Sequence, residues 1–176
     1  VGPGSLVTRP PRHFRRVLIN PHNDGRVELT LGTRNHTGRN VSASLRLVLR
    51  PHCRGAEQPA STLAAGALAI PGGEAELTAG FKVEKPRLWN PENPWLYDLE
   101  LQVLNGAGAL LESHPERFGF REFTIRGDKF LLNGERVRLY GGNILTAGGW
   151  EQFHPAGPYR MELRRQRQQG ANAIRY

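Results

Sequence analysis

Aromatic side chains gather in a proline-rich stretch near the middle of the chain. Trp89, Trp95 and Tyr97 have rings of the kind that stack on the flat faces of sugars. Large aromatic side chains are also typical of hydrophobic cores. The surrounding prolines place these three residues at the entrance to an expected strand, and this setting favours packing over a sugar-binding platform.

Metal and thiol chemistry have little support in the sequence. His154 has no partner at a metal-ligand spacing, and the chain contains no cluster of cysteine and histidine. Cys53 is the only cysteine, which excludes an intrachain disulfide. Trp150, Phe153 and His154 share a stretch that is expected to be a loop, and loop packing is favoured for them. We therefore predict no metal site and no cofactor.

The net charge of +8 is concentrated in the first third of the chain. Residues 1–54 contain ten arginines against Asp24 and Glu28, whereas residues 55–176 contain fourteen basic and fourteen acidic side chains. A strongly basic surface is typical of nucleic-acid binding, but no aromatic-rich recognition motif accompanies it. We expect a solvated or interdomain basic face instead.

Length and composition indicate a globular protein. The chain has 176 residues, of which 38% are hydrophobic and 23% charged, and this size fits one domain or one and a part. No run approaches the roughly 18 apolar residues that span a bilayer, so no membrane partner is expected. The chain starts at Val1 without a signal peptide, so we expect a segment of a longer protein. The triplets at 35–37 and 40–42 match the N-glycosylation pattern, which also occurs often by chance.

Alternation of apolar and polar residues dominates the first 125 residues. It is clearest in four runs, at residues 27–31, 41–49, 75–83 and 97–103. Each run gives a strand one apolar and one polar face, as an antiparallel sheet covered on one side requires. Turn signals separate the runs, and further strands are expected near residues 15–19 and 116–123. This spacing predicts an immunoglobulin-like antiparallel β-sandwich.

A different pattern begins after Ile125. Asn133-Gly134 is a dipeptide that favours a tight two-residue hairpin turn, so residues 130–140 are expected to form a hairpin. The hairpin leads into Gly141-Gly142-Asn143, where a strand is expected to end in a loop.

A helix and another strand are expected to follow that loop. Pro158 is suited to the first helical position and Gly170 to the position just after the helix, and residues 172–176 have the composition of a strand. Strand, loop, helix and strand make a βαβ unit, the repeating element of a (β/α)8 barrel. A complete barrel needs roughly 250 residues, so the barrel predicted here is truncated.

Four blocks of sequence follow one another in an order that points to a known family. They are residues 86–97 (PRLWNPENPWLY), 117–123 (RFGFREF), 130–143 and 170–175 (GANAIR). They resemble, in turn, the middle domain of glycoside hydrolase family 2, the linker strand that leaves it, the hairpin with the first barrel strand, and the second barrel strand. The resemblance covers residues 15–176.

The resemblance implies a domain division and an activity. Residues 1–14 would be a linker from a preceding domain, residues 15–124 the immunoglobulin-like sandwich, and residues 125–176 the start of the barrel. The parent protein would be a retaining, exo-acting β-glycosidase whose substrate is a β-linked oligosaccharide or glycoside. That reaction uses two carboxyl groups about 5–5.5 Å apart. In the family both are glutamates on later barrel strands, so no catalytic residue is assigned here and the chain alone is expected to be inactive.

Two positions carry over from the family to substrate binding. Arg175 matches the arginine at the end of the second barrel strand, which orients the nucleophilic carboxylate and holds it ionised. The structural alternative is a salt-bridge residue at the barrel rim. Asn143, at the end of the first barrel strand, would contact the sugar or cap the loop. Family members commonly have a histidine two residues later, where this chain has Leu145, so the sugar specificity is not implied.

Other residues and other classes of function complete the prediction. Phe118 and Phe120 are expected to be core or interdomain contacts, and Arg117 and Arg121 to bridge the sandwich to the barrel. A non-catalytic carbohydrate-binding or adhesive sandwich module is disfavoured by the motifs after Phe123. A nucleic-acid-binding domain is disfavoured by the neutral remainder of the chain. Oligomeric state and compartment are undetermined.

Overall fold

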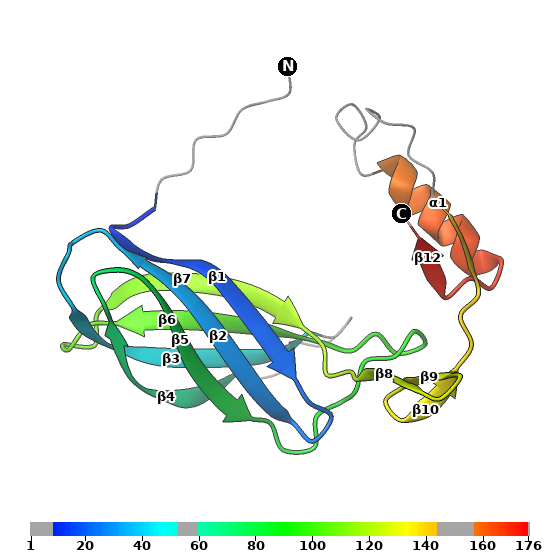
Figure 1. Ribbon diagram of the computed structural model, residues 1–176, viewed down its shortest axis with the longest axis horizontal. Coiled ribbons are helices and arrows are strands. Elements are labelled where there is room, and N and C mark those ends of the chain that lie inside the picture. Colours follow the sequence, from blue (N-terminus) through cyan, green and yellow to red (C-terminus); the bar gives the residue numbers. More distant parts are fainter. Residues whose placement is uncertain (1–8, 53–59, 144–156, 176) are drawn as a thin grey trace. The chain divides into compact units, whose positions relative to one another are not determined.

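The computed structural model describes residues 9–52, 60–143 and 157–175 (Figure 1). These residues fall into two compact units. One extends to Thr124 and includes Leu132–Gly134; the other contains Ile125–Leu131 and the residues from Glu135 onward. Within the described ranges, no helix combines the length and the hydrophobicity needed to cross a bilayer.

The larger unit is a sandwich of two antiparallel sheets. One has three strands in the order β1-β2-β5, and the other has four in the order β4-β3-β6-β7. The first sheet contains β1 (Arg12–Pro21), β2 (Arg26–Asn35) and β5 (Gly73–Lys82). The second contains β3 (Val41–His52), β4 (Ser61–Ile70), β6 (Leu96–Leu104) and β7 (Leu110–Phe118). The predicted β-sandwich is therefore confirmed.

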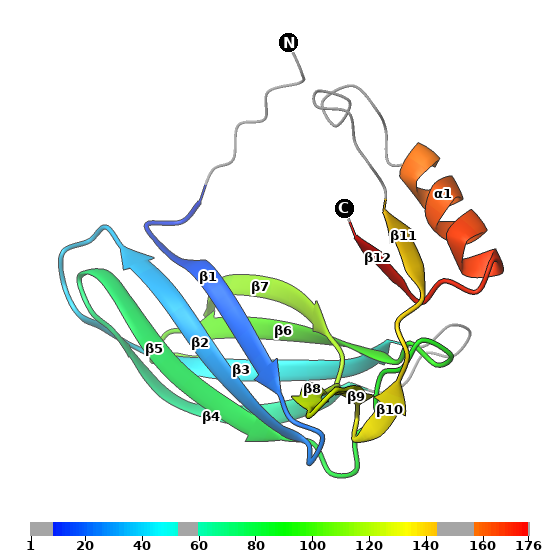
Figure 2. The ribbon, with the colours of Figure 1, turned by 45° about the vertical axis from the view of Figure 1, so that its right-hand side comes forward.

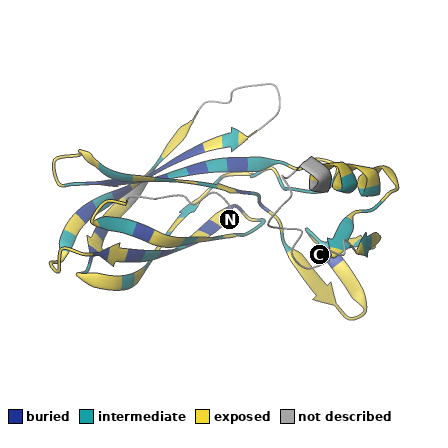
Figure 3. Cartoon of the chain, turned by 90° about the horizontal axis from the view of Figure 1, so that it is seen from above, coloured by how far each residue is buried: buried dark blue, intermediate teal, exposed yellow. Residues whose placement is uncertain are grey.

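The core of the sandwich comes from the alternation that the sequence displays. In β2, Val27, Leu29 and Leu31 are at most 1% exposed, whereas the residues between them are exposed or half-buried. Leu99 and Leu101 of β6 are buried in the same way. Each such side chain contributes roughly 1.5–3 kcal/mol of hydrophobic free energy. Buried residues recur along the sandwich strands in Figure 3, whereas helix α1 (Gly157–Gln168) shows exposed and half-buried residues.

An aromatic cluster closes one part of this core. Tyr97, Phe118 and Phe120 are 5%, 8% and 0% exposed, and their ring centroids lie 5.2–5.8 Å apart. The Tyr97 hydroxyl accepts a hydrogen bond from the backbone N–H of Arg87 at 2.9 Å. The prediction that Phe118 and Phe120 are core residues is confirmed.

One sandwich strand, β4, was missed in the sequence. After Ser61 and Thr62 its residues are alanine, glycine, leucine and isoleucine, so no polar residues alternate with them to mark a strand. β4 is an edge strand that pairs only with β3. The strand expected near residues 116–123 is divided in the structure between β7 and a shorter strand, β8 (Phe123–Arg126).

A small three-stranded sheet follows the sandwich. β8, β9 (Lys129–Leu132) and β10 (Glu135–Val137) lie in the order β10-β9-β8. The turn between β9 and β10 is Asn133-Gly134, with φ of 53° and 85°. Two consecutive positive φ values are what a type I′ turn requires, and asparagine followed by glycine tolerates them best. The predicted hairpin turn is confirmed at this dipeptide.

The last elements are β11 (Gly141–Asn143), α1 and β12 (Ala173–Arg175). β11 and β12 pair in parallel, and α1 lies beside them (Figure 2). Gly170 has a φ of 89°, which glycine accepts without strain and which ends the helix. Met161 and Leu163 are 72% and 46% exposed, as expected from the thin apolar stripe of this helix.

Candidate functional site

The parallel pair β11–β12 brings the two predicted substrate-binding residues together. Asn143 and Arg175 are Cα partners in the register, at the carboxyl ends of neighbouring strands. Both side chains are exposed. An amide and a guanidinium at adjacent strand ends present several N–H donors, which suit carboxylate or hydroxyl groups. Their roles toward a substrate stay a prediction.

Glycine makes the close pairing of these strands feasible. A Cβ atom at Gly141 would lie 1.6 Å from the carbonyl oxygen of Ala173, far inside contact distance. A Cβ atom at Gly142 would meet the side chain of Gln166 on α1 at 3.5 Å. Gly141 therefore admits β12, whereas the contact at Gly142 is one that a methyl group would also tolerate.

Asn172, which sequence reasoning did not single out, binds the chain just before β11. Its side-chain Oδ1 accepts a hydrogen bond from Tyr140 N–H, and its Nδ2 donates to the carbonyl oxygen of Arg138, both at 2.8 Å. Its own backbone N–H donates to the Tyr140 carbonyl oxygen at 2.8 Å. The available signal was its position next to a strand end, where asparagine side chains often bind backbone groups.

The aromatic residues of the proline-rich stretch pack within the sandwich unit. The guanidinium of Arg87 lies 4.3 Å from the ring centroid of Trp95, and that of Arg121 lies 4.9 Å from Trp89. Such cation–π contacts cover the ring faces that a sugar would need. The structure thus supports packing for these residues. Trp150, Phe153, His154 and Leu145 lie outside the described residues.

The two arginines expected to bridge the sandwich and the barrel have partners inside the sandwich unit. Arg117 Nε donates to Asp98 Oδ1 at 2.5 Å across the β6–β7 pair. Arg121 lies over Trp89, which belongs to the same unit. These contacts account for one partner of each arginine within the sandwich unit, and the expected bridge to the barrel stays a prediction.

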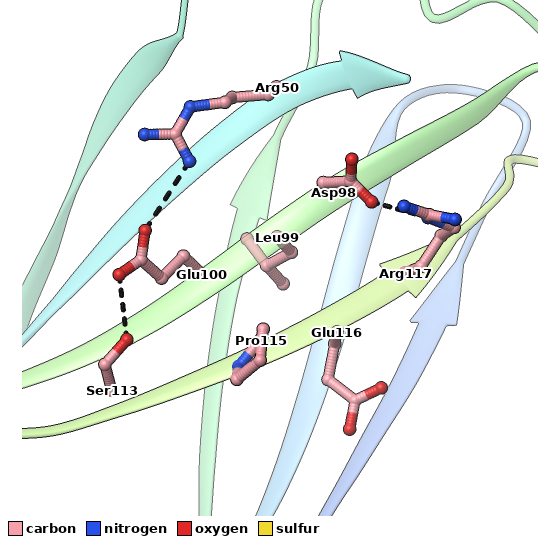
Figure 4. A pocket seen from close by; sticks show the side chains of 8 residues that line it. All are labelled: Arg50, Asp98, Leu99, Glu100, Ser113, Pro115, Glu116 and Arg117. Atoms are coloured by element: carbon pink, nitrogen blue, oxygen red, sulfur yellow. Dashed lines mark hydrogen bonds and ion pairs between the residues drawn. The ribbon is translucent and has the colours of Figure 1, made fainter. Parts of the chain in front are cut away.

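A hollow of about 570 Å³ with several charged side chains in its lining lies on the outer face of the four-stranded sheet (Figure 4). Arg50 forms an ion pair with Glu100 at 3.5 Å, and Glu100 accepts a hydrogen bond from Ser113 at 2.8 Å. Asp98 pairs with Arg117 and with His52. The sequence gives no sign of this hollow, because strand pairing brings its residues together.

Two carboxylates of the hollow, Glu100 and Asp98, have lowered pKa values. Hydrogen bonds from Gln102 and Ser113 lower the pKa of Glu100. Partial burial would raise the pKa of Asp98, but hydrogen bonds from Arg117 and His52 outweigh it and the net shift is downward. A general acid needs a raised pKa to carry a proton near neutral pH. Glu100 and Asp98 therefore fit a structural ion-pair network better than the role of a general acid.

The basic first third of the chain meets acidic partners from β5. Arg15 and Arg34 both pair with Glu74, the latter at 2.7 Å, and Arg16 pairs with Glu76 at 3.0 Å. These contacts follow from the antiparallel order β1-β2-β5. Three arginines of this basic segment are thus paired with two glutamates across strands, on side chains that remain half exposed to solvent.

No metal centre is found in the part of the chain that the structure describes, where no three His, Cys, Asp or Glu side chains are grouped to hold an ion. Arg175 and Asn143 offer N–H donors and a single amide oxygen, which is not a metal-binding set. The absence of a cofactor stays a prediction.

Comparison with known proteins identifies the family. The model of glycosyl hydrolases family 2 matches residues 13–121, more than half of the chain. The chain belongs to this family of glycoside hydrolases.

Individual relatives are longer proteins. A β-galactosidase of Aeromonas hydrophila is 31% identical over 150 residues, which cover 79% of this chain and 14% of that protein. A putative β-glucuronidase of Formosa agariphila is 33% identical over 107 residues, covering 57% of this chain and 10% of that protein. The chain therefore spans about a seventh or less of these relatives.

Solved structures share the fold. A β-D-mannosidase from Dictyoglomus thermophilum has a TM-score of 0.72 at 21% identity, covering 94% of this chain and 21% of that one. A family 2 β-galacturonidase from Eisenbergiella tayi has a TM-score of 0.73 at 20% identity, covering 93% and 29%. At this identity the likeness concerns the fold alone.

Proposed function

We propose that this chain is part of a retaining, exo-acting β-glycosidase and contributes its immunoglobulin-like scaffold and the first βαβ unit of its (β/α)8 barrel. Family membership supports the reaction class. The observation that carries the proposal is the parallel pair β11–β12, which has Asn143 and Arg175 side by side at its carboxyl end. In (β/α)8 barrels the active site lies at the carboxyl ends of the strands.

In this proposal the sandwich, residues 15–124, acts as scaffold and residues 125–176 begin the barrel. The two catalytic glutamates lie outside the chain, one as acid and base and the other as nucleophile. Arg175 donates charge-assisted hydrogen bonds to the nucleophilic carboxylate, which keeps it ionised and oriented. Asn143 donates to a sugar hydroxyl. The substrate is a β-linked glycoside; the relatives are named for different sugars, so the sugar is left open.

The test is hydrolysis of aryl β-glycosides by the full-length protein that carries this chain. We expect Arg175→Ala to lower kcat/KM at least about tenfold, which is roughly 1.4 kcal/mol of transition-state stabilisation. Arg175→Lys keeps the positive charge but loses the bidentate hydrogen-bonding geometry of the guanidinium. Its kcat/KM should therefore lie between those of Arg175→Ala and the wild type. Arg164→Ala, on the exposed side of α1, is the matched control and should leave the rate unchanged.

Three results would contradict the proposal. Wild-type kinetics in Arg175→Ala would reduce this residue to a structural one. Turnover by the isolated 176-residue chain would show that the catalytic carboxyl groups are not outside it. A full-length protein that hydrolyses no β-glycoside would remove the assigned activity altogether.

A further inference from the structure

Asn172 lies one residue before β12 and is bound to the chain before β11 through its backbone N–H and both polar groups of its side chain. Its Oδ1 receives the Tyr140 N–H, its Nδ2 reaches the Arg138 carbonyl oxygen, and its backbone N–H reaches the Tyr140 carbonyl oxygen, each at 2.8 Å. Ala173 N–H also donates to the Tyr140 carbonyl oxygen at 3.1 Å. The side-chain amide thus adds two hydrogen bonds between the segments that lead into the parallel strand pair.

The strands themselves specify their register weakly. β11 and β12 have three residues each, and two of those in β11 are Gly141 and Gly142, which offer no side chain to pack. Register slips are favoured where strands are short and rich in glycine. A slip of one residue would turn Arg175 to the opposite face of the strand pair and remove it from Asn143.

The amide of Asn172 opposes such a slip because it has both a donor and an acceptor. Tyr140 N–H and the Arg138 carbonyl oxygen are of opposite kind, so only a side chain with N–H and C=O at this reach satisfies both. Aspartate offers no donor, and alanine offers neither group. After a one-residue shift the same amide would meet other backbone groups, and these bonds would be lost.

We propose that Asn172 is a positioning residue that locks the register of β12 against β11 and so holds Arg175 next to Asn143. Its effect on catalysis rests on the proposed glycosidase function, but the lock itself does not. Asn172 does not touch the reacting atoms; it acts through Arg175.

The register is measured directly by disulfide formation in the full-length protein. The variant Asn143→Cys/Arg175→Cys places the thiols at paired positions, and Asn143→Cys/Ile174→Cys places them one residue out of register. With Asn172 present, mild oxidation should link the paired positions first, as read by peptide mass spectrometry. Adding Asn172→Ala should lower the ratio of paired to offset linkage at least about fivefold, because the disulfide geometry depends closely on Cα spacing.

The catalytic consequence is measured in the same protein without added cysteines. Asn172→Ala should lower kcat at least about tenfold with little change in KM, because small misplacements of a transition-state contact are costly. Asn172→Asp keeps the acceptor for Tyr140 N–H and should lie between wild type and Asn172→Ala. When Asn172→Ala is combined with Arg175→Ala, kcat should fall almost no further than in Arg175→Ala alone. Both changes remove the same contribution, that of Arg175.

The matched control is Asn105→Ala in the sandwich. Asn105 Oδ1 accepts hydrogen bonds from the backbone N–H groups of Ala107 and Ala109, so it has a comparable local role in a hairpin turn. Its loss should alter neither linkage ratio nor kcat. Circular dichroism of each variant verifies that it is folded.

The outcomes separate the lock from the proposed function. An unchanged linkage ratio in Asn172→Ala overturns the lock, whether or not the wild-type protein is active. A changed ratio with unchanged kcat in an active enzyme overturns the positioning role. Additive losses in the double variant with Arg175→Ala would also overturn it, because they would mean that Asn172 acts elsewhere.

Discussion

At the scale of single residues, Asn35 shows how a buried polar side chain organises a turn. It is 1% exposed, and its Nδ2 donates to the carbonyl oxygens of Arg39 and Pro71 at 2.8 and 3.1 Å. Its Oδ1 accepts from the backbone N–H and the hydroxyl of Thr37. The triplet at 35–37 therefore matches a glycosylation pattern without offering an accessible asparagine in the folded domain.

We expect Asn35→Ala to lower the free energy of unfolding by about 2–3 kcal/mol, because it leaves several backbone groups without partners. Asn40→Ala is the matched control: Asn40 is exposed, and its Oδ1 accepts one hydrogen bond, from Gly72 N–H. That change should cost about 1 kcal/mol or less. Urea denaturation followed by circular dichroism measures both, and equal losses would contradict the role of burial.

At the scale of elements, the edges of the two sheets are joined where β1 breaks its regular pairing. The register of β1 against β2 shifts between Phe14 and Arg16. There, Phe14 N–H donates to Glu112 Oε1 of β7 at 2.9 Å, and the Phe14 carbonyl oxygen accepts from Arg9 at 3.1 Å. A bulge frees backbone groups from a ladder, and here side chains satisfy them.

The carboxyl group of Glu112, which joins β7 to β1, has a raised pKa. Burial raises the pKa of Glu112 above 4.5, against the opposing effects of the Phe14 N–H and of the charges on His114, His13 and Arg9. A group with a raised folded-state pKa contributes stability that is present below its unfolded pKa. That contribution is lost as pH rises through the folded pKa.

Glu112→Gln keeps an oxygen acceptor for Phe14 N–H but cannot ionise. We expect this variant to gain stability relative to wild type as pH rises from about 4.5 toward neutrality. Asp98→Asn should do the opposite, because the pKa of Asp98 is lowered and its contribution is lost as pH falls. Thermal unfolding at a series of pH values measures both differences. A parallel pH dependence of wild type and Glu112→Gln would contradict the assignment.

At the scale of the whole molecule, the hydrophobic core belongs to the sandwich unit. Leu31, Leu47 and Leu101 are 0% exposed, from strands of both sheets, whereas Met161 and Leu163 on α1 are largely exposed. Among the described residues, the burial of apolar side chains therefore stabilises mainly the sandwich.

Leu101→Ala should accordingly lower the free energy of unfolding of the sandwich by about 2–5 kcal/mol, through lost burial and a cavity. Leu163→Ala, at 46% exposure, should change it by about 0.5 kcal/mol or less. Denaturation monitored by the near-ultraviolet signal of the buried Tyr97 and its neighbouring rings reports on this unit. Comparable losses in the two variants would contradict a core confined to the sandwich.

Local chemistry in the sequence was enough for much of the fold. The period of two in β2, β3, β5 and β6 identifies strands with one buried face, because side chains alternate along any extended chain. Asn133-Gly134 identifies its own turn, because positive φ is a property of those residues. The composition of β4 carries no such alternation, so its place in the sheet depends on pairing with β3.

Tertiary structure decided what the sequence left open about the candidate site. Motif order singled out Asn143 and Arg175, but only strand pairing makes them neighbours, and Asn172 takes part through contacts with residues more than thirty positions away. In the same way, Arg16 and Arg34 of the basic first third pair with glutamates that β5 brings alongside. Backbone preference is local and can be read from neighbouring residues, whereas register and charge pairing join distant segments and exist only once the chain has folded.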